Sequence, residues 1–387
     1  MGAIILTTMY WIFGFLRMGT VSLVGQAAGA GDDDEASAWL TRALLVAGVG
    51  GVGLILLQVP LFWLAFQLSP ASAEVESLTR DYLFIRIWTA PAAIAVYALT
   101  GWLVAMERTG GVFWVQLVMN GVNIILNFVF VLGFGWGVPG VAIATVIAEL
   151  IGAGLGLWFC RAAFVRPAWR DWPRVLRRAQ LIRMALLNTD ILLRSLMLMI
   201  IFSSFVFLGA RFGDVTLAAN EVLIQFMYIT AHAMDGFAFA AETLIARAYG
   251  RKDPARVRRS AVITSMWGMV ICASTAFAFL LVGPWLIDVM AKDADVQQVA
   301  RDYLLWMVAA PLVGCAAWML DGIFIGAGRG RDMRNMMAIS FVLYWLAVFA
   351  LLPVMGNHGL WAAILISFVA RGVTLGLRYP ALERAAA

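Results

Sequence analysis

The amino-acid sequence predicts an all-α protein that crosses a membrane eleven times, with its helices in two related lobes of five and six. Composition is the first reason: 63% of the residues are hydrophobic and 13% are charged. One or two soluble cores could not bury that much apolar surface, so a bilayer must be the solvent. A series of long apolar segments is the second reason. The third is an internal repeat, in which Arg-Asp-Tyr-Leu at 80–83 returns about 220 positions later at 301–304.

The repeat sets the expected domain organisation. Gly101 matches Gly322 at the same spacing, and a long repeat in an apolar chain indicates two membrane-spanning halves fused head to tail. The second copy contains a helix near 184–209 whose counterpart would fall before residue 1. We therefore expect an incomplete first lobe over 1–162, a cytoplasmic linker over 163–183 and a complete second lobe over 184–387.

Length and apolarity place the individual spans, because crossing the bilayer takes about 20 mostly apolar residues. Helices are expected throughout, since the alternating pattern of a membrane β-barrel is absent. The expected spans are 3–28, 38–68, 83–106, 112–134, 138–162, 184–209, 216–247, 260–289, 303–326, 337–355 and 359–378.

Loop charges predict the orientation. Arginines crowd 161–183, 251–259 and 329–334, and the C-terminal tail is assigned Arg371, Arg378 and Arg384, whereas the alternate loops carry few basic residues. Basic loops stay in the cytosol, so the C-terminus is expected to be cytoplasmic. The linker reads either as an interfacial helix or as a charged connection with aromatic anchors. The two lobes should be related by an axis along the membrane normal, with a cavity between them.

The richest set of intramembrane polar residues lies on the segment 216–247. Its members recur at steps of three, four and seven, which places them on one face of a helix. Such a stripe lines either a cavity that binds substrate or protons, or a packed polar seam between helices. Only Arg17 and Arg194 are expected as deep basic partners. The stripe consists of Glu221, Gln225, Tyr228, His232, Asp235 and Glu242.

Other acids and amides fall inside expected spans. Asp190 and Arg194 are spaced to pair on one helix face, as a packing ion pair or as a coupling element. Asp321 has no partner nearby in the sequence, and Glu149 is the one deep acid expected in the first half. An unpaired acid in the membrane is a natural proton carrier.

Amides form a second pattern, on the segment 112–134. Asn120, Asn123 and Asn127 follow one face, where amides either bridge helices or contact a ligand. Catalytic motifs, metal-ligand spacing and nucleic-acid signatures are absent from the sequence. We therefore expect no enzymatic activity, no cofactor, no metal site and no nucleic-acid partner.

Four strings carry a resemblance to a known family. They are Phe-Leu-Arg-Met-Gly-Thr at 15–20, Leu-Asn-Thr-Asp-Ile-Leu-Leu-Arg-Ser at 187–195, Leu-Asp-Gly-Ile-Phe-Ile-Gly-Ala at 320–327 and Gly-Asn-His-Gly-Leu-Trp at 356–361. The chain resembles the DNA-damage-inducible (DinF-type) branch of the multidrug and toxic compound extrusion (MATE) family. The resemblance implies a twelve-helix, two-lobe inner-membrane exporter that exchanges cytosolic compounds for protons or sodium ions.

Two departures from the family pattern affect the expected coupling. The family's first helix, with its aspartate, has no counterpart here, either through a start site assigned too far downstream or through a real truncation. The family's Asn-x-x-x-Asp reads Asn123 to Asn127 in this chain. Coupling is therefore expected to rest mainly on Asp190, Asp235, Glu242 and Asp321, with Glu149 in the first lobe.

The leading functional prediction is cation-coupled efflux of amphipathic, cationic small molecules by a monomer embedded in the bilayer. The acidic stripe favours organic cations, and abundant methionine and aromatic residues favour adaptable binding. Two alternatives stay open. One is a flippase for lipid-linked precursors, which would need a basic cavity. The other is a membrane remnant that does not transport.

Overall fold

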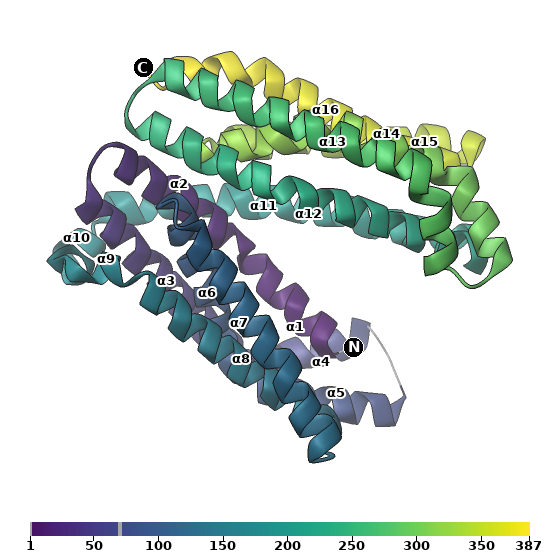
Figure 1. Cartoon of the computed structure of the whole chain (residues 1–387), viewed down its shortest axis with the longest axis horizontal. Coiled ribbons are helices and arrows are strands. Elements are labelled where there is room, and N and C mark those ends of the chain that lie inside the picture. Colours follow the sequence, from purple (N-terminus) through teal and green to yellow (C-terminus); the bar gives the residue numbers. More distant parts are fainter. Residues whose placement is uncertain (1, 69–71) are drawn as a thin grey trace. The chain divides into compact units, whose positions relative to one another are not determined.

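The computed structural model describes residues 2–68 and 72–387, which form a succession of helices (Figure 1). Eleven of the described helices are long and apolar enough to cross a membrane, as the sequence predicts. The α-helices are α1 (Gly2–Trp11), α2 (Phe15–Gly29), α3 (Asp33–Leu56), α4 (Gln58–Leu68), α5 (Ala73–Arg86), α6 (Ala90–Ala105), α7 (Thr109–Asn127), α8 (Gly137–Phe159), α9 (Arg161–Val165), α10 (Trp172–Val175), α11 (Arg178–Gly209), α12 (Asp214–Gly250), α13 (Pro254–Met290), α14 (Ala294–Gly326), α15 (Gly330–Met355) and α16 (Asn357–Arg384).

Two expected spans are interrupted where prolines remove backbone donors. The segment predicted as one helix over 38–68 divides at Leu57, because Pro60 cannot donate to the carbonyl of Leu56. Similarly, a 3₁₀ turn at Ile87–Thr89 separates α5 from α6, whose second residue is Pro91. Its counterpart in the second half, Pro311, lies inside α14, which stays helical throughout.

The chain forms two compact units, Met1–Asn188 and Thr189–Ala387, and the boundary between them falls within α11. In the first unit, α6 packs against α2, α3 and α8. In the second, α14 packs against α12, α13 and α16, while α15 packs against α16. One central helix in each unit, α6 or α14, therefore holds several others.

Glycines at matching positions allow the central helix of each unit to approach a neighbour. A Cβ added to Gly101 on α6 would lie 2.6 Å from the carbonyl oxygen of Arg17 on α2. A Cβ added to Gly322 on α14 would lie 2.9 Å from the carbonyl oxygen of Ala238 on α12. Because Arg17 and Ala238 are also about 220 positions apart, the repeated sequence produces the same helix contact twice.

The cores of both units are apolar and aromatic. In the second unit Trp361 is fully buried, and its ring contacts Phe205 edge-on with centroids 4.4 Å apart. In the first unit Leu83 and Ile87 anchor a cluster that includes Tyr10. The three cysteines are buried and unbonded, in agreement with a core-filling role.

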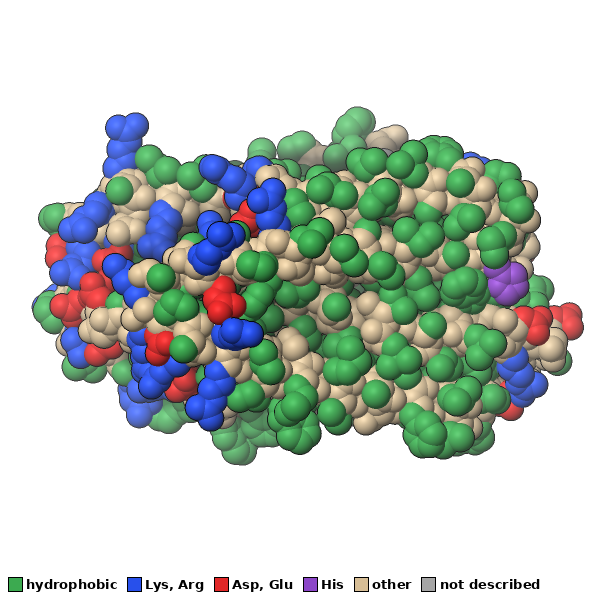
Figure 2. Space-filling model, turned by 90° about the horizontal axis from the view of Figure 1, so that it is seen from above, with side chains coloured by type: hydrophobic (Ala, Val, Ile, Leu, Met, Phe, Trp, Pro, Cys, Tyr) green, Lys and Arg blue, Asp and Glu red, His purple; other side chains and the backbone are tan. Residues whose placement is uncertain are grey.

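A short, broken connection joins α8 to α11 and is tied to α3 by a buried arginine. Arg42 donates hydrogen bonds to the carbonyl oxygens of Val175 at 2.8 Å and Arg174 at 2.7 Å, and to a carboxylate oxygen of Glu35 at 2.7 Å. Its side chain is fully buried. The connection contains only short helical turns, so it is not a continuous interfacial helix. Figure 2 shows Lys and Arg side chains gathered at one end of the face that it displays.

The repeated glycine contact can be tested by adding a methyl group. We expect Gly101→Ala to lower the thermal unfolding midpoint of the detergent-solubilised protein, because overpacking against a backbone carbonyl costs about 1–3 kcal/mol. Gly154→Ala, on α8 of the same unit, is the control, since nothing lies within 4 Å of its added Cβ. Equal stability of the two variants would contradict the close contact between α2 and α6.

Candidate functional site

The polar stripe predicted on α12 lies mostly on the exposed face of the helix. Glu221, Gln225, His232 and Asp235 are exposed, and Tyr228 is 51% exposed. Glu242, the sixth predicted member, is instead buried at 2% exposure. The opposite face packs into the core of the second unit through Leu223, Phe226, Met227, Thr230 and Met234.

The ring of His232, on this exposed face, contacts the backbone of its own helix. The Nδ1 atom of His232 lies 2.6 Å from the carbonyl oxygen of Tyr228, one turn earlier. Because a carbonyl only accepts, Nδ1 carries the hydrogen, and Nε2 is the ring atom left to exchange protons or bind a ligand. A face with two acids, an amide and a histidine on a spanning helix requires protein or water beside it rather than lipid.

Asp321 has buried partners, contrary to the expectation that it is unpaired. Arg194 on α11 hydrogen-bonds to its Oδ2 atom, and Arg371 on α16 places Nη1 3.7 Å from the same oxygen. All three side chains are at most 10% exposed. This cluster was not predicted from the sequence, because its members lie on three different helices. In addition, Arg371 was assigned to the basic residues of the C-terminal tail.

The expected pair of Asp190 and Arg194 does not form. Arg194 is engaged by Asp321, while Asp190 accepts a hydrogen bond from Nη1 of Arg334 at 2.6 Å. Arg334 is 34% exposed and lies in the first turns of α15. The spacing of Asp190 and Arg194 would allow a contact within α11, but each residue instead pairs with a residue on a neighbouring helix.

Glu149 in the first unit also has an arginine partner that the sequence did not reveal. Arg86 at the end of α5 hydrogen-bonds to Oε1 of Glu149, and Thr89 donates to Oε2 at 2.5 Å. Tyr82 accepts from Nη1 of Arg86 at 3.0 Å, and Tyr10 donates to the Arg86 carbonyl oxygen at 3.3 Å. The sequence feature that could have indicated this pair is the position of Arg86 between two isoleucines, inside the expected span 83–106.

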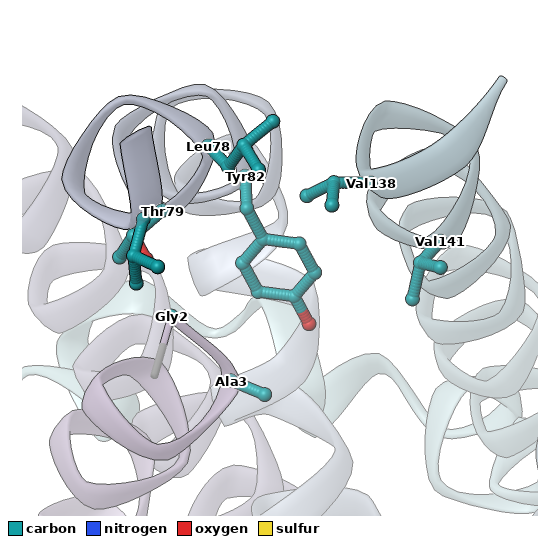
Figure 3. A pocket seen from close by; sticks show the side chains of 8 residues that line it. Gly2, Ala3, Leu78, Thr79, Tyr82, Val138 and Val141 are labelled. Carbon is teal, nitrogen blue, oxygen red and sulfur yellow. The ribbon is translucent and has the colours of Figure 1, made fainter. Parts of the chain in front are cut away.

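The first unit also contains a cavity of about 340 Å³, lined in part by Tyr82 (Figure 3). The start of α1, the middle of α5 and the first turns of α8 form its walls, largely from apolar side chains such as Leu78, Val138 and Val141. The ring of Tyr82 points into the space between α1 and α8. Its hydroxyl group contacts Arg86, so the wall of the cavity is connected to the charged centre.

The predicted asparagines make local and interhelical hydrogen bonds. Asn123 donates to Oγ1 of Thr145 on α8 at 3.0 Å, and Asn127 donates to Oδ1 of Asn123 at 3.0 Å. Asn120 donates to the carbonyl oxygen of Gln116 at 2.9 Å. The Asn123–Thr145 contact ties α7 to α8, which is how amides act between membrane helices, whereas the other two contacts lie within α7.

No group of three metal-ligating side chains occurs within residues 2–68 and 72–387. Instead of such a group, the interior of each unit has carboxylates held by arginines. On the exposed face of α12, by contrast, the predicted acids Glu221 and Asp235 have exposed side chains.

The Arg86–Glu149 pair predicts a non-additive effect on stability. Either Arg86→Gln or Glu149→Gln leaves one buried charge without its partner, a loss of about 3–5 kcal/mol. We expect the double variant to have a higher thermal unfolding midpoint than either single variant. Glu76→Gln is the control, because the Arg80–Glu76 pair is exposed and such pairs contribute little. Additive effects in the double variant would contradict the pairing.

Comparison with known proteins identifies the family. The MatE family model matches residues 1–129 and 191–350. DNA damage-inducible protein F of Escherichia coli is 34% identical over 97% of this chain and 82% of its own length. A probable multidrug resistance protein NorM of Rhizobium meliloti is 28% identical over 99% of this chain and 86% of its own length.

Solved structures show the same fold. The crystal structure of the Vibrio cholerae MATE transporter VcmN in its bent form has a TM-score of 0.85 at 20% identity, over 98% of this chain and 87% of that one. An outward-facing multidrug resistance MATE transporter has a TM-score of 0.82 at 17% identity, over 99% of this chain and 89% of that one. With its eleven candidate spans and the matching family model, the chain belongs to the MATE family of efflux transporters and is not an enzyme.

Proposed function

We propose that this chain is a secondary active exporter that moves amphipathic organic cations out of the cytosol in exchange for protons or sodium ions. The observation that carries the proposal is the exposed, acid-bearing face of α12. A charged side chain at the centre of a bilayer costs about 2.5–3.5 kcal/mol even on the mildest scales. A face with Glu221 and Asp235 is therefore suited to a water-filled pathway that admits positive charge.

The chemistry of this face favours cationic, partly aromatic substrates. Glu221 and Asp235 supply negative charge, and Tyr228 supplies a ring that is half exposed. Aromatic faces attract organic cations within about 6 Å of the ring centroid. Gln225 and His232 add hydrogen-bonding groups that suit varied polar substituents.

Exposure distinguishes among the predicted coupling acids. The side chains of Glu149, Asp190 and Asp321 lie beside arginines and are at most 14% exposed. Asp235 lies on the exposed face with His232 one turn before it. We assign to Asp235 the main exchange between coupling ion and substrate, and to Glu242, buried two turns further along α12, a supporting role.

Orientation and assembly form part of the same proposal. We place the C-terminus and the basic connection between α8 and α11 in the cytosol of a bacterial inner membrane, because basic loops are retained on that side. The chain is proposed to work as a monomer, with the bilayer as its surroundings.

The proposal is tested by dye efflux in a host that lacks its own pumps, with pH and sodium gradients imposed separately. We expect Asp235→Asn to reduce export of a cationic dye at least tenfold, since the variant can neither bind a proton nor balance a cation. Collapse of the driving gradient should abolish export by the wild-type chain. Asp288→Asn is the control, because Asp288 is an exposed acid at the end of α13, paired with Arg301.

Two results would contradict the proposal. Export that persists at full rate in Asp235→Asn would remove Asp235 from coupling. Absence of gradient-driven export by the wild-type chain, in membranes shown to contain it, would overturn the efflux function itself.

A further inference from the structure

We propose that the second unit contains a buried binding site for a small monovalent anion, formed by Arg194, Asp321 and Arg371. These three residues are called the arginine triad below. They come from α11, α14 and α16, and both guanidinium groups meet the same carboxylate oxygen, Oδ2 of Asp321. The site is distinct from the exposed face of α12 assigned to exported cations.

The charge of the triad is unbalanced. Arginine does not lose its proton in proteins, so two guanidinium groups and one carboxylate carry a net charge of +1. Asp190 does not supply the missing negative charge, because it is itself paired with Arg334. An isolated charge in an apolar interior is costly unless it is paired. A second anion next to the two arginines would neutralise the triad.

The triad also has hydrogen-bond donors to offer. The Nε atoms of Arg194 and Arg371 are both buried, and neither has a hydrogen-bond partner among the described residues. Arg371 is 2% exposed, and its other neighbours are Sδ of Met337, 3.9 Å from Nη1, and the ring of Phe368. Neither neighbour is a strong acceptor, so an anion would satisfy donors that the protein leaves unpaired.

The centre of the first unit shows what a balanced arrangement looks like. There, one arginine faces one carboxylate, and the hydroxyl groups of Tyr82 and Thr89 contact Arg86 and Glu149. The Nε atom of Arg86 is also buried without a hydrogen-bond partner among the described residues. The second unit has two arginines for one carboxylate. The two centres therefore differ in net charge, and this difference, not an unpaired Nε atom, distinguishes the second from the first.

The size and the route of the anion follow from the surroundings. The triad is enclosed by packed helices, which favours a compact anion such as chloride, bromide or nitrate over a bulky one. Asp321 lies five residues before the end of α14 at Gly326, or about 8 Å along the helix at 1.5 Å per residue.

Binding of radioactive chloride to the purified full chain in detergent tests the site directly. We expect saturable binding to the wild-type protein, displaced by bromide or nitrate and not by gluconate at equal ionic strength. Arg371→Gln should abolish binding, because it neutralises the triad. Asp321→Asn should increase affinity several-fold, since it raises the net charge to +2. Arg256→Gln, which changes an exposed arginine of the same unit, should bind as the wild type does.

The outcomes are decisive in each direction. The absence of saturable chloride binding to the wild-type chain, or binding that Arg371→Gln leaves unchanged, would overturn the proposal. If Arg371→Gln does not fold, Asp321→Asn decides: affinity equal to or below that of the wild type would contradict an anion held by excess positive charge. Dye efflux is not part of this readout, so failure here leaves the cation-export proposal intact, and failure of that proposal leaves this one intact.

Discussion

The interiors of both units depend on one constraint: a charge placed among apolar helices must be matched by an opposite charge or by strong hydrogen bonds. Arg86 and Glu149 satisfy it in the first unit by joining α5 to α8. Arg194 and Asp321 satisfy it in the second by joining α11 to α14. Lipid does not drive helices together as water does, so these pairs help to determine which helices become neighbours.

A second constraint, on the distance between helix backbones, is met by glycine. Helices in a membrane approach closely where side chains are small, and the central helix of each unit has a glycine at the point of closest contact. Gly101 meets the backbone at Arg17, and Gly322 meets it at Ala238. Since both partners of this contact recur at one spacing, the internal repeat preserves a packing interaction and not merely a similar composition.

Much of the fold could be predicted from the sequence, because hydropathy and helix length are local properties. The eleven spans and their approximate ends follow from runs of apolar residues. The break at Leu57 required attention to Pro60, whose missing N–H removes a specific helical hydrogen bond. Local sequence patterns therefore predict where the helices lie better than they predict where a helix is interrupted.

The ion pairs could not be predicted in the same way, because they depend on which helices pack together. Asp190 and Arg194 had ideal spacing for a pair on one helix, yet Arg334 and Asp321 are their partners. Arg371 was grouped with the tail because basic residues near a C-terminus usually lie in the cytosol. An arginine with apolar neighbours inside an expected span, such as Arg86, deserves a search for a buried acid.

Charge balance also separates structural acids from acids suited to transport. A carboxylate bound to arginine is neutralised by the protein itself, so a passing cation gains little by approaching it. Glu221, on the exposed face of α12, has no arginine partner among the described residues of its own unit. Under the proposed export function, cations would therefore interact with the surface of α12. The excess positive charge of the arginine triad calls for a ligand of the opposite sign, so one helical unit would use two kinds of charged site for two different ions.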